Sequence, residues 1–178
     1  MYGLNVSTRP RPQRGTRAPR IGEIRLRKGD FSAAEDAFRH AHELGEEPQP
    51  GLSLLRLAQG KVEAAASSIK RALADVSLSP LDRARRLPAQ VEIALAAGDT
   101  DSARSAATEL EGIAKTYKAS ALEASAACAR GALALAEGDV SAACRSLRES
   151  LRLWQEVDMP YEAARAWMLL ATACRAEG

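Results

Sequence analysis

Apolar residues recur every three or four positions along most of the chain, in long stretches that glycines separate. One such stretch runs through Ala103, Ala107, Leu110 and Ala114. This spacing places the apolar side chains on one face of an α-helix. Helices are predicted over residues 20–28, 31–45, 51–59, 61–76, 80–97, 100–117, 119–137, 140–157 and 160–177. The pattern therefore predicts an all-α fold of about nine helices.

A glycine returns at nearly constant intervals and marks an internal repeat. The repeated residues are Gly29, Gly60, Gly98, Gly138 and Gly178, separated by 31, 38, 40 and 40 positions. An alanine stands five residues after each of the first four, and a second core position lies nine residues after, at Phe38, Ile69, Ala107 and Leu147. Self-similarity at this period is typical of helical solenoids. It predicts antiparallel helix pairs, about four and a half in number, with small residues where helices cross.

Each predicted turn between paired helices carries residues that end one helix and begin the next. Glycine suits the left-handed position just after a helix C-terminus. An aspartate follows it at Asp30, Asp99 and Asp139, where the side chain can cap the second helix and oppose its N-terminal dipole. Pro80 and Pro160 mark two helix starts, because proline is favoured at the first helical position.

These features resemble the tetratricopeptide repeat (TPR) in degenerate form. The stretch from Leu151 to Arg165, LRLWQEVDMPYEAAR, is similar to the end of the TPR-like region of large LuxR-type bacterial transcriptional regulators, where the pattern is roughly LWxxLxxPYExAR. The stretch from Gly29 to Gly60 resembles an upstream unit of that region. The resemblance covers about residues 21–178. It implies a TPR-like, right-handed solenoid domain over residues 20–178.

In that family the repeats follow an ATPase module, precede a DNA-binding helix-turn-helix, and serve as a sensing and partner-binding arm. This sequence has no Walker-type GxxxxGKS/T, and no helix-turn-helix follows Gly178, so the resemblance implies neither nucleotide nor DNA binding here. The expectation is a protein-interaction or sensing module that binds a protein or peptide, from a truncated or split LuxR-type regulator.

The first helix of each pair lines the binding groove in TPR proteins. Counting back from the repeated glycines places six charged residues on or near that face: Glu23, Arg27, Arg85, Glu92, Arg165 and Arg175. A groove of mixed charge would suit a peptide segment. For each of the six, a solvated surface charge is the alternative interpretation.

Composition and charge narrow the alternatives. Of 178 residues, 46% are hydrophobic, 37 are alanine and only 4% are aromatic, which favours close-packed helices over sheets. The net charge is +2, yet residues 1–20 hold five arginines and no acid, so the remainder carries −3. Residues 1–19, with Pro10, Pro12 and Pro19, are predicted to be a disordered tail. Two alternative functions therefore remain. The basic arm could make the protein an accessory nucleic-acid binder, and a pocket between repeats could make it a small-molecule sensor.

The sequence has no acid–base group of residues typical of an active site, so neither enzymatic activity nor a bound metal or cofactor is expected. His40 and His42 diverge by about 200° on a helix, so they cannot share a metal. The carboxylate pairs Glu46–Glu47 and Glu109–Glu111 are predicted to be solvated. The three cysteines, Cys128, Cys144 and Cys174, are predicted to be reduced, buried thiols. With no apolar stretch long enough to span a membrane, a cytoplasmic protein is expected.

The last predicted helix has apolar residues on more than one side. Tyr161, Trp167, Met168, Leu169 and Leu170 cannot all face the preceding unit. Part of this surface is therefore expected to stay open to water. Self-association through the C-terminal helix is the predicted consequence.

Overall fold

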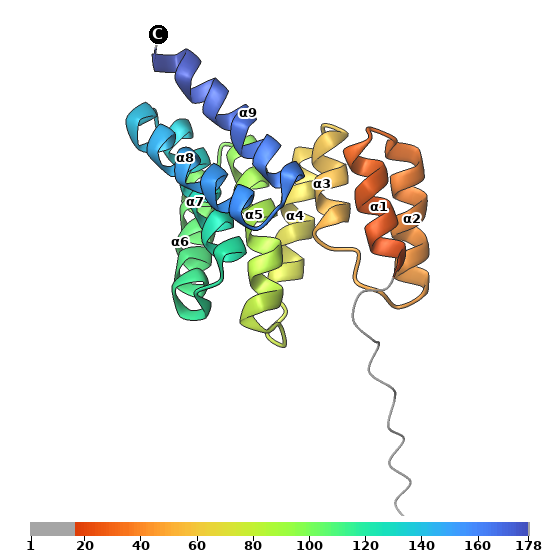
Figure 1. The fold of residues 1–178 in the computed structure, drawn as a ribbon. Coiled ribbons are helices and arrows are strands. Elements are labelled where there is room, and N and C mark those ends of the chain that lie inside the picture. The colour runs from red at the N-terminus through yellow and green to blue at the C-terminus, as the bar shows by residue number, and fades with distance from the viewer. Residues whose placement is uncertain (1–16, 178) are drawn as a thin grey trace, which may run out of the picture. The chain divides into compact units, whose positions relative to one another are not determined.

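The computed structural model describes residues 17–177, which form helices joined by turns and short linkers (Figure 1). The helices are α1 (Arg17–Arg27), α2 (Phe31–Glu43), α3 (Gly51–Ala58), α4 (Val62–Leu73), α5 (Pro80–Ala96), α6 (Thr100–Tyr117), α7 (Ser120–Ala136), α8 (Val140–Glu156) and α9 (Pro160–Glu177). No strand occurs in this range, which confirms the all-α prediction. None of these helices combines the length and apolar character needed to cross a bilayer.

The first helix begins earlier than the sequence predicts. α1 starts at Arg17, whereas the predicted tail extends to residue 19. Pro19 fits into the first turn because the first four N–H groups of a helix have no intrahelical acceptor. The rest of the predicted tail, residues 1–16, lies outside the described residues.

The chain divides into two compact units, with the boundary between Pro48 and Gln49. In the first unit, α1 packs against α2. A Cβ atom at Gly22 would lie 2.4 Å from the ring of Phe38, so the two helices touch closely there. The sequence predicts one domain over residues 20–178 instead, because a hydrophobic pattern reports the buried face of each helix and not which helices share a core.

In the second unit, each helix from α3 to α8 packs against the next one along the chain. α5 also packs against α3 and α7, and α7 also packs against α9. Among the described residues, the backbones of the even-numbered helices α4, α6 and α8 do not approach one another closely. The odd-numbered helices therefore lie side by side, and each even-numbered helix packs on them.

The repeat positions predicted as core are buried. Ala34, Ala65, Ala103 and Ala143 are all 0% exposed, and Phe38, Ile69, Ala107 and Leu147 are at most 4% exposed. Gly131 of α7 is another small residue at a helix crossing, because a Cβ there would lie 2.6 Å from Cγ of Leu147 on α8. The small-residue positions of the repeat are thus confirmed as places where helices approach closely.

Of the three cysteines predicted to be buried, Cys144 is buried, Cys128 is half-buried and Cys174 is exposed, so the prediction for Cys174 was wrong. Trp167 and Met168 are 53% and 72% exposed, so part of the apolar surface of α9 is open to water, as predicted. Helical spacing assigns a residue to a face, but a neighbouring helix must also cover that part of the face.

The turn between α5 and α6 illustrates the role of the repeated Gly–Asp pair. Gly98 has a φ of 73°, and its N–H donates to the carbonyl of Leu95 at 3.1 Å. The N–H of Asp99 donates to the carbonyl of Ala94 at 2.9 Å, which completes a Schellman cap. Oδ1 of Asp99 then accepts from the N–H of Ser102 at 3.0 Å. Asp30 and Asp139 cap α2 and α8 in the same way, so the predicted caps are confirmed.

The Asp99 cap gives the protein a defined acid sensitivity. Hydrogen bonds with Ser102, and then Lys70 at 3.1 Å, lower the pKa of Asp99 from 3.8 to about 2. Because the pKa in the folded state lies below the unfolded value, the carboxylate's contribution to stability is present above about pH 4 and is lost as the pH falls toward 2. We expect Asp99→Asn to flatten the pH dependence of the free energy of unfolding in this range, measured by urea denaturation.

Asp101→Asn is the matched control for this experiment. The Asp101 side chain is 95% exposed and lies two residues further along the chain. Asp101 pairs with Arg104 at 2.7 Å but caps no helix, so the control should change the slope with pH less than Asp99→Asn does. Identical slopes for wild type and Asp99→Asn would contradict the prediction.

Candidate functional site

Two of the charged residues predicted to line a groove meet in the structure. Glu92 on α5 and Arg165 on α9 are 73 residues apart in the chain, and Nη2 of Arg165 lies 2.5 Å from Oε2 of Glu92. Nη1 of Arg165 lies 3.7 Å from Oε2 of Glu162, one turn earlier on α9. Burial opposes the charge on Arg165, but the two carboxylates outweigh it and raise its pKa. Arg165 is therefore a cation held between two carboxylates.

Cys128 lies on α7, the helix that contacts both α5 and α9. The half-buried Cys128 thiol lies within the electrostatic influence of Arg165, Glu162 and Glu92. Burial raises the pKa of Cys128, although Arg165 and a hydrogen bond with Ser150 act in the opposite direction. Burial thus favours the protonated thiol of Cys128 over its thiolate.

We refer to Arg85, Glu92, Cys128, Glu162 and Arg165 as the α5–α7–α9 face. Arg85 is exposed and lies seven residues before Glu92, which is two turns along the same side of α5. Glu92 and Arg165 have side chains 43% and 42% exposed. The face therefore presents both signs of charge to solvent, at positions fixed by the packing of three helices.

The remaining predicted groove residues do not join this face. Glu23 and Arg27 lie on α1 in the first unit, where Glu23 is half-buried and Arg27 is exposed. Arg175 is exposed in the last turn of α9. Ten residues separate it from Arg165, so it points about 80° away around the helix. Of the six predicted residues, the structure thus brings Glu92 and Arg165 together, with Arg85 on the same side of α5.

Two residues of the face were missed by the sequence analysis. Glu162 stands three residues before Arg165, and that spacing alone predicts that the two side chains are neighbours on a helix. No spacing in the sequence predicts that Cys128 lies near Arg165. Its place beside Arg165 depends on how closely α7 and α9 approach, which no local pattern reveals.

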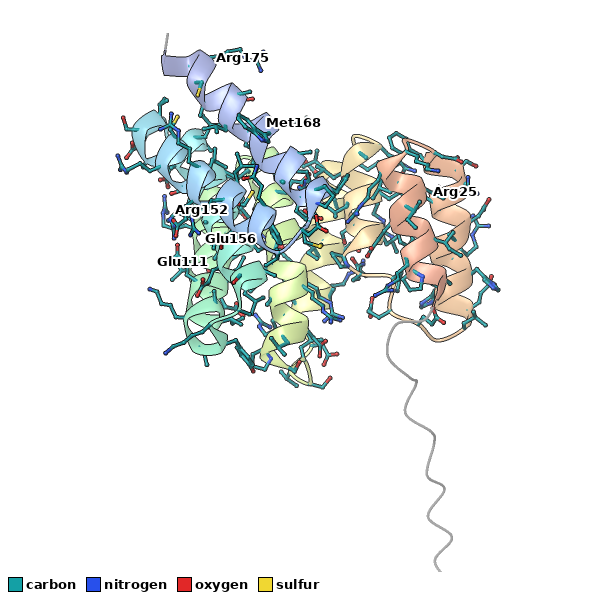
Figure 2. All side chains as sticks on the ribbon, in the orientation of Figure 1. Arg25, Glu111, Arg152, Glu156, Met168 and Arg175 are labelled. Carbon is teal, nitrogen blue, oxygen red and sulfur yellow. The ribbon has the colours of Figure 1, made fainter. Side chains whose placement is uncertain are left out.

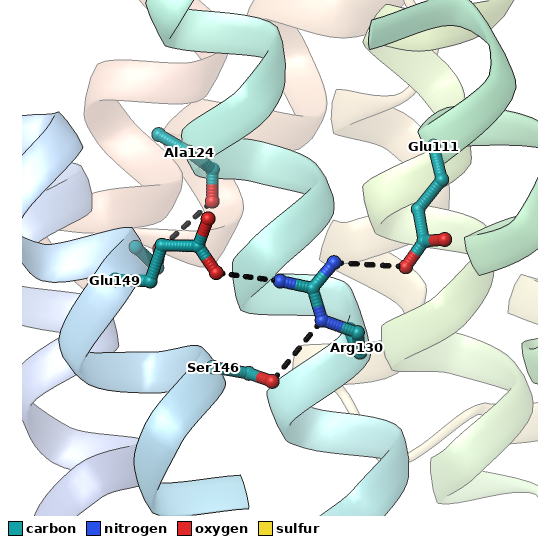
Figure 3. A network of polar contacts seen from close by, with 6 residues as sticks. Glu111, Ala124, Arg130, Ser146 and Glu149 are labelled. Atoms are coloured by element: carbon teal, nitrogen blue, oxygen red, sulfur yellow. Dashed lines mark hydrogen bonds and ion pairs between the residues drawn. The ribbon is translucent and has the colours of Figure 1, made fainter. Parts of the chain in front are cut away.

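The side chain of Arg130 on α7 joins this helix to α6 and α8. Figure 3 shows Arg130 of α7, whose Nη1 lies 3.1 Å from Glu111 on α6 and whose Nη2 lies 2.7 Å from Glu149 on α8. Its Nε also donates to Ser146 of α8 at 3.1 Å. In the same figure, Ala124 of α7 accepts a hydrogen bond from the buried Ser150 hydroxyl at 2.8 Å. These contacts fix α7 against both even-numbered neighbours.

The carboxylates Glu109 and Glu111 are paired and not simply solvated, so that prediction was wrong. Oε2 of Glu109 accepts from Nη2 of Arg83 at 2.8 Å, and this hydrogen bonding lowers the pKa of Glu109. Glu111 pairs with Arg130 as described above. Each carboxylate lies on α6, and each arginine reaches it from a different helix, a contact that sequence spacing cannot reveal.

Two hollows lie away from the α5–α7–α9 face. One, of about 520 Å³, lies between α8 and α9, and the other, of about 320 Å³, lies among α4, α5 and α6. Gln90 lines the second hollow, and its buried Oε1 has no hydrogen-bond donor among the described residues. His40 and His42 are both exposed. No group of three metal-ligating side chains comes together in the part of the chain that the structure describes.

No protein-family model matches the chain, and neither a curated protein nor a solved structure is significantly similar to it.

Proposed function

We propose that the protein is a protein-interaction and sensing module built as a right-handed, TPR-like solenoid, of the kind found in the repeat region of LuxR-type regulators. Two observations support this arrangement. Odd-numbered helices contact one another in the order α3, α5, α7, α9, and each even-numbered helix packs only on odd-numbered ones. The repeated alanines are also completely buried at equivalent positions of successive pairs. Both are features of stacked helix pairs.

The α5–α7–α9 face is the proposed binding surface, and its ligand is a peptide segment of a partner protein. The observation that carries this assignment is the cation of Arg165 held between Glu92 and Glu162. Fixed, half-exposed charges of both signs lose little conformational freedom on binding, and they can orient the charged side chains of a peptide. Arg85, two turns away from Glu92, extends the charged surface along α5.

The experiment selects peptides and then maps where they bind. A random 12-residue peptide library displayed on phage is selected against the immobilised full chain, and enriched peptides are titrated in solution by fluorescence anisotropy. We expect Arg85→Glu to weaken these peptides about tenfold, because reversing an exposed charge turns attraction of an acidic side chain into repulsion. The exposed Arg85 makes no ion pair among the described residues, so the fold should be retained.

Arg145→Glu is the matched control, because Arg145 is also an exposed helical arginine but lies on α8. It should leave the affinity of the selected peptides unchanged. The proposal fails if no peptide enriches above an unrelated helical protein, or if the two reversals weaken binding equally.

A further inference from the structure

A crevice between α8 and α9 remains open on the side of these helices away from the α5–α7–α9 face. Its residues are Arg148, Leu151, Arg152 and Gln155 of α8 and Trp167, Leu170, Ala171 and Cys174 of α9. The hollow has a volume of about 520 Å³. Its floor is apolar, and Trp167 on its wall is 53% exposed, whereas the other tryptophan, Trp154, is 8% exposed.

The internal repeat indicates what fits such a crevice. Ala171 and Cys174 stand 40 residues after Gly131 and Ala134 of α7, which is the spacing of the last two repeated glycines. Gly131 lies against Leu147 of α8, and Ala134 shares a buried cluster with the same residue. On α7 these two repeat positions are covered by α8. The corresponding positions of α9, Ala171 and Cys174, are exposed. An α-helix is the element that this surface is shaped to receive.

The charges beside the crevice define the chemistry of that helix. Arg148 and Arg152 lie on α8, and Arg175 lies one turn beyond Ala171 on α9; Figure 2 labels Arg152 and Arg175 on these two helices. Arg152 is paired with Glu156 of its own helix. Arg148 and Arg175 have no ion pair among the described residues. Within the described side chains, the apolar floor thus has a cation without an ion-pair partner on each side.

We propose that the α8–α9 crevice binds an amphipathic helix of a partner protein, with an apolar stripe that carries aspartate or glutamate along both edges. Such a helix covers the apolar floor and pairs with Arg148 and Arg175 at once. This occupant differs from the second copy of the chain that the sequence predicts at the C-terminal helix, because symmetric pairing of the crevices would bring like-charged arginines together. The surface is separate from the α5–α7–α9 face and does not depend on the function proposed for that face.

The test uses a synthetic helix as the probe. A fluorescein-labelled 18-residue peptide carries leucine at helical positions i, i+3, i+4 and i+7 with glutamate on both flanks, and its control replaces every glutamate with lysine. Both are titrated with the full chain by fluorescence anisotropy. We expect the glutamate peptide to bind at least about tenfold more tightly than the lysine peptide. Equal affinities, or no binding of the glutamate peptide, would overturn the proposal.

A pair of variants then locates the binding site. Ala171 lines the crevice, whereas Ala176 is exposed on the same helix and does not line it, so Ala171→Glu and Ala176→Glu add the same charge at matched sites. We expect only Ala171→Glu to weaken the glutamate peptide, by about tenfold. Equal weakening would mean binding by general charge attraction and would refute the site. Sedimentation of the chain without peptide tests whether a second copy occupies the crevice. A dimer that Ala171→Glu dissociates would also refute the proposal.

Discussion

Replacing Phe38 with alanine is expected to lower the free energy of unfolding by about 3–5 kcal/mol. Phe38 is 1% exposed, and its ring lies against Gly22 of the facing helix in a unit whose described helices are α1 and α2. A two-helix unit has few other large side chains to fill the resulting cavity. Urea denaturation measures the loss, and hydrogen exchange should show the increased opening concentrated in α1 and α2.

The other phenylalanine of the chain provides a matched control. Phe31 is the first residue of α2 and is 37% exposed. Phe31→Ala removes the same atoms from the same helix, yet it should cost clearly less than Phe38→Ala, because less buried area is lost and solvent can fill the vacated space. Equal losses for the two variants would show that Phe38 is not the centre of this core.

Gly131→Leu is the second variant with a large expected effect. A Cβ at residue 131 would lie 2.6 Å from Cγ and 2.9 Å from Cδ2 of Leu147, and 3.4 Å from the carbonyl oxygen of Ala143. Leu147 is 0% exposed and cannot move aside into solvent. Overpacking such a crossing costs about 1–3 kcal/mol, which the helix propensity of leucine offsets by up to about 1 kcal/mol. We expect a net loss of stability in urea denaturation.

Gly112→Leu is the control that separates the packing clash at a helix crossing from the gain in helix propensity. Gly112 is also within a helix, α6, but a Cβ there would meet no atom within 4 Å. This variant gains helix propensity without a clash, so it should be stabilised by up to about 1 kcal/mol. The two glycine variants should thus differ by about 1–3 kcal/mol. A Gly131→Leu protein at least as stable as Gly112→Leu would contradict the observed helix crossing.

The helices could be predicted from the sequence because their ends are encoded locally. The pair Gly98–Asp99 ends one helix and caps the next with hydrogen bonds to residues at most five positions away. Apolar spacing then reveals the buried face, and Ala103 and Leu147 are 0% exposed as predicted. Every predicted helix boundary lies within three residues of the observed one.

The candidate site could be predicted only in part, since its contacts join distant helices. Glu92 and Arg165 were placed on one face by their repeat positions, and the structure brings them into contact. Arg175 was placed there too, but α9 is long enough to turn it away. Cys128 was missed because only the packing of α7 against α9 brings it near Arg165.

Because the backbones of α4, α6 and α8 do not approach one another closely in the described residues, side-chain ion pairs link these helices on the even-numbered side of the second unit. Along the odd-numbered helices, bending must compress or separate apolar surfaces that already touch. On the even-numbered side, bending would stretch the ion pairs of Arg130. This α7 residue links Glu111 of α6 to Glu149 of α8. Half-exposed ion pairs are screened by salt and stretch at little cost. The Arg130 link should therefore weaken as ionic strength rises, and bending on that side should become easier.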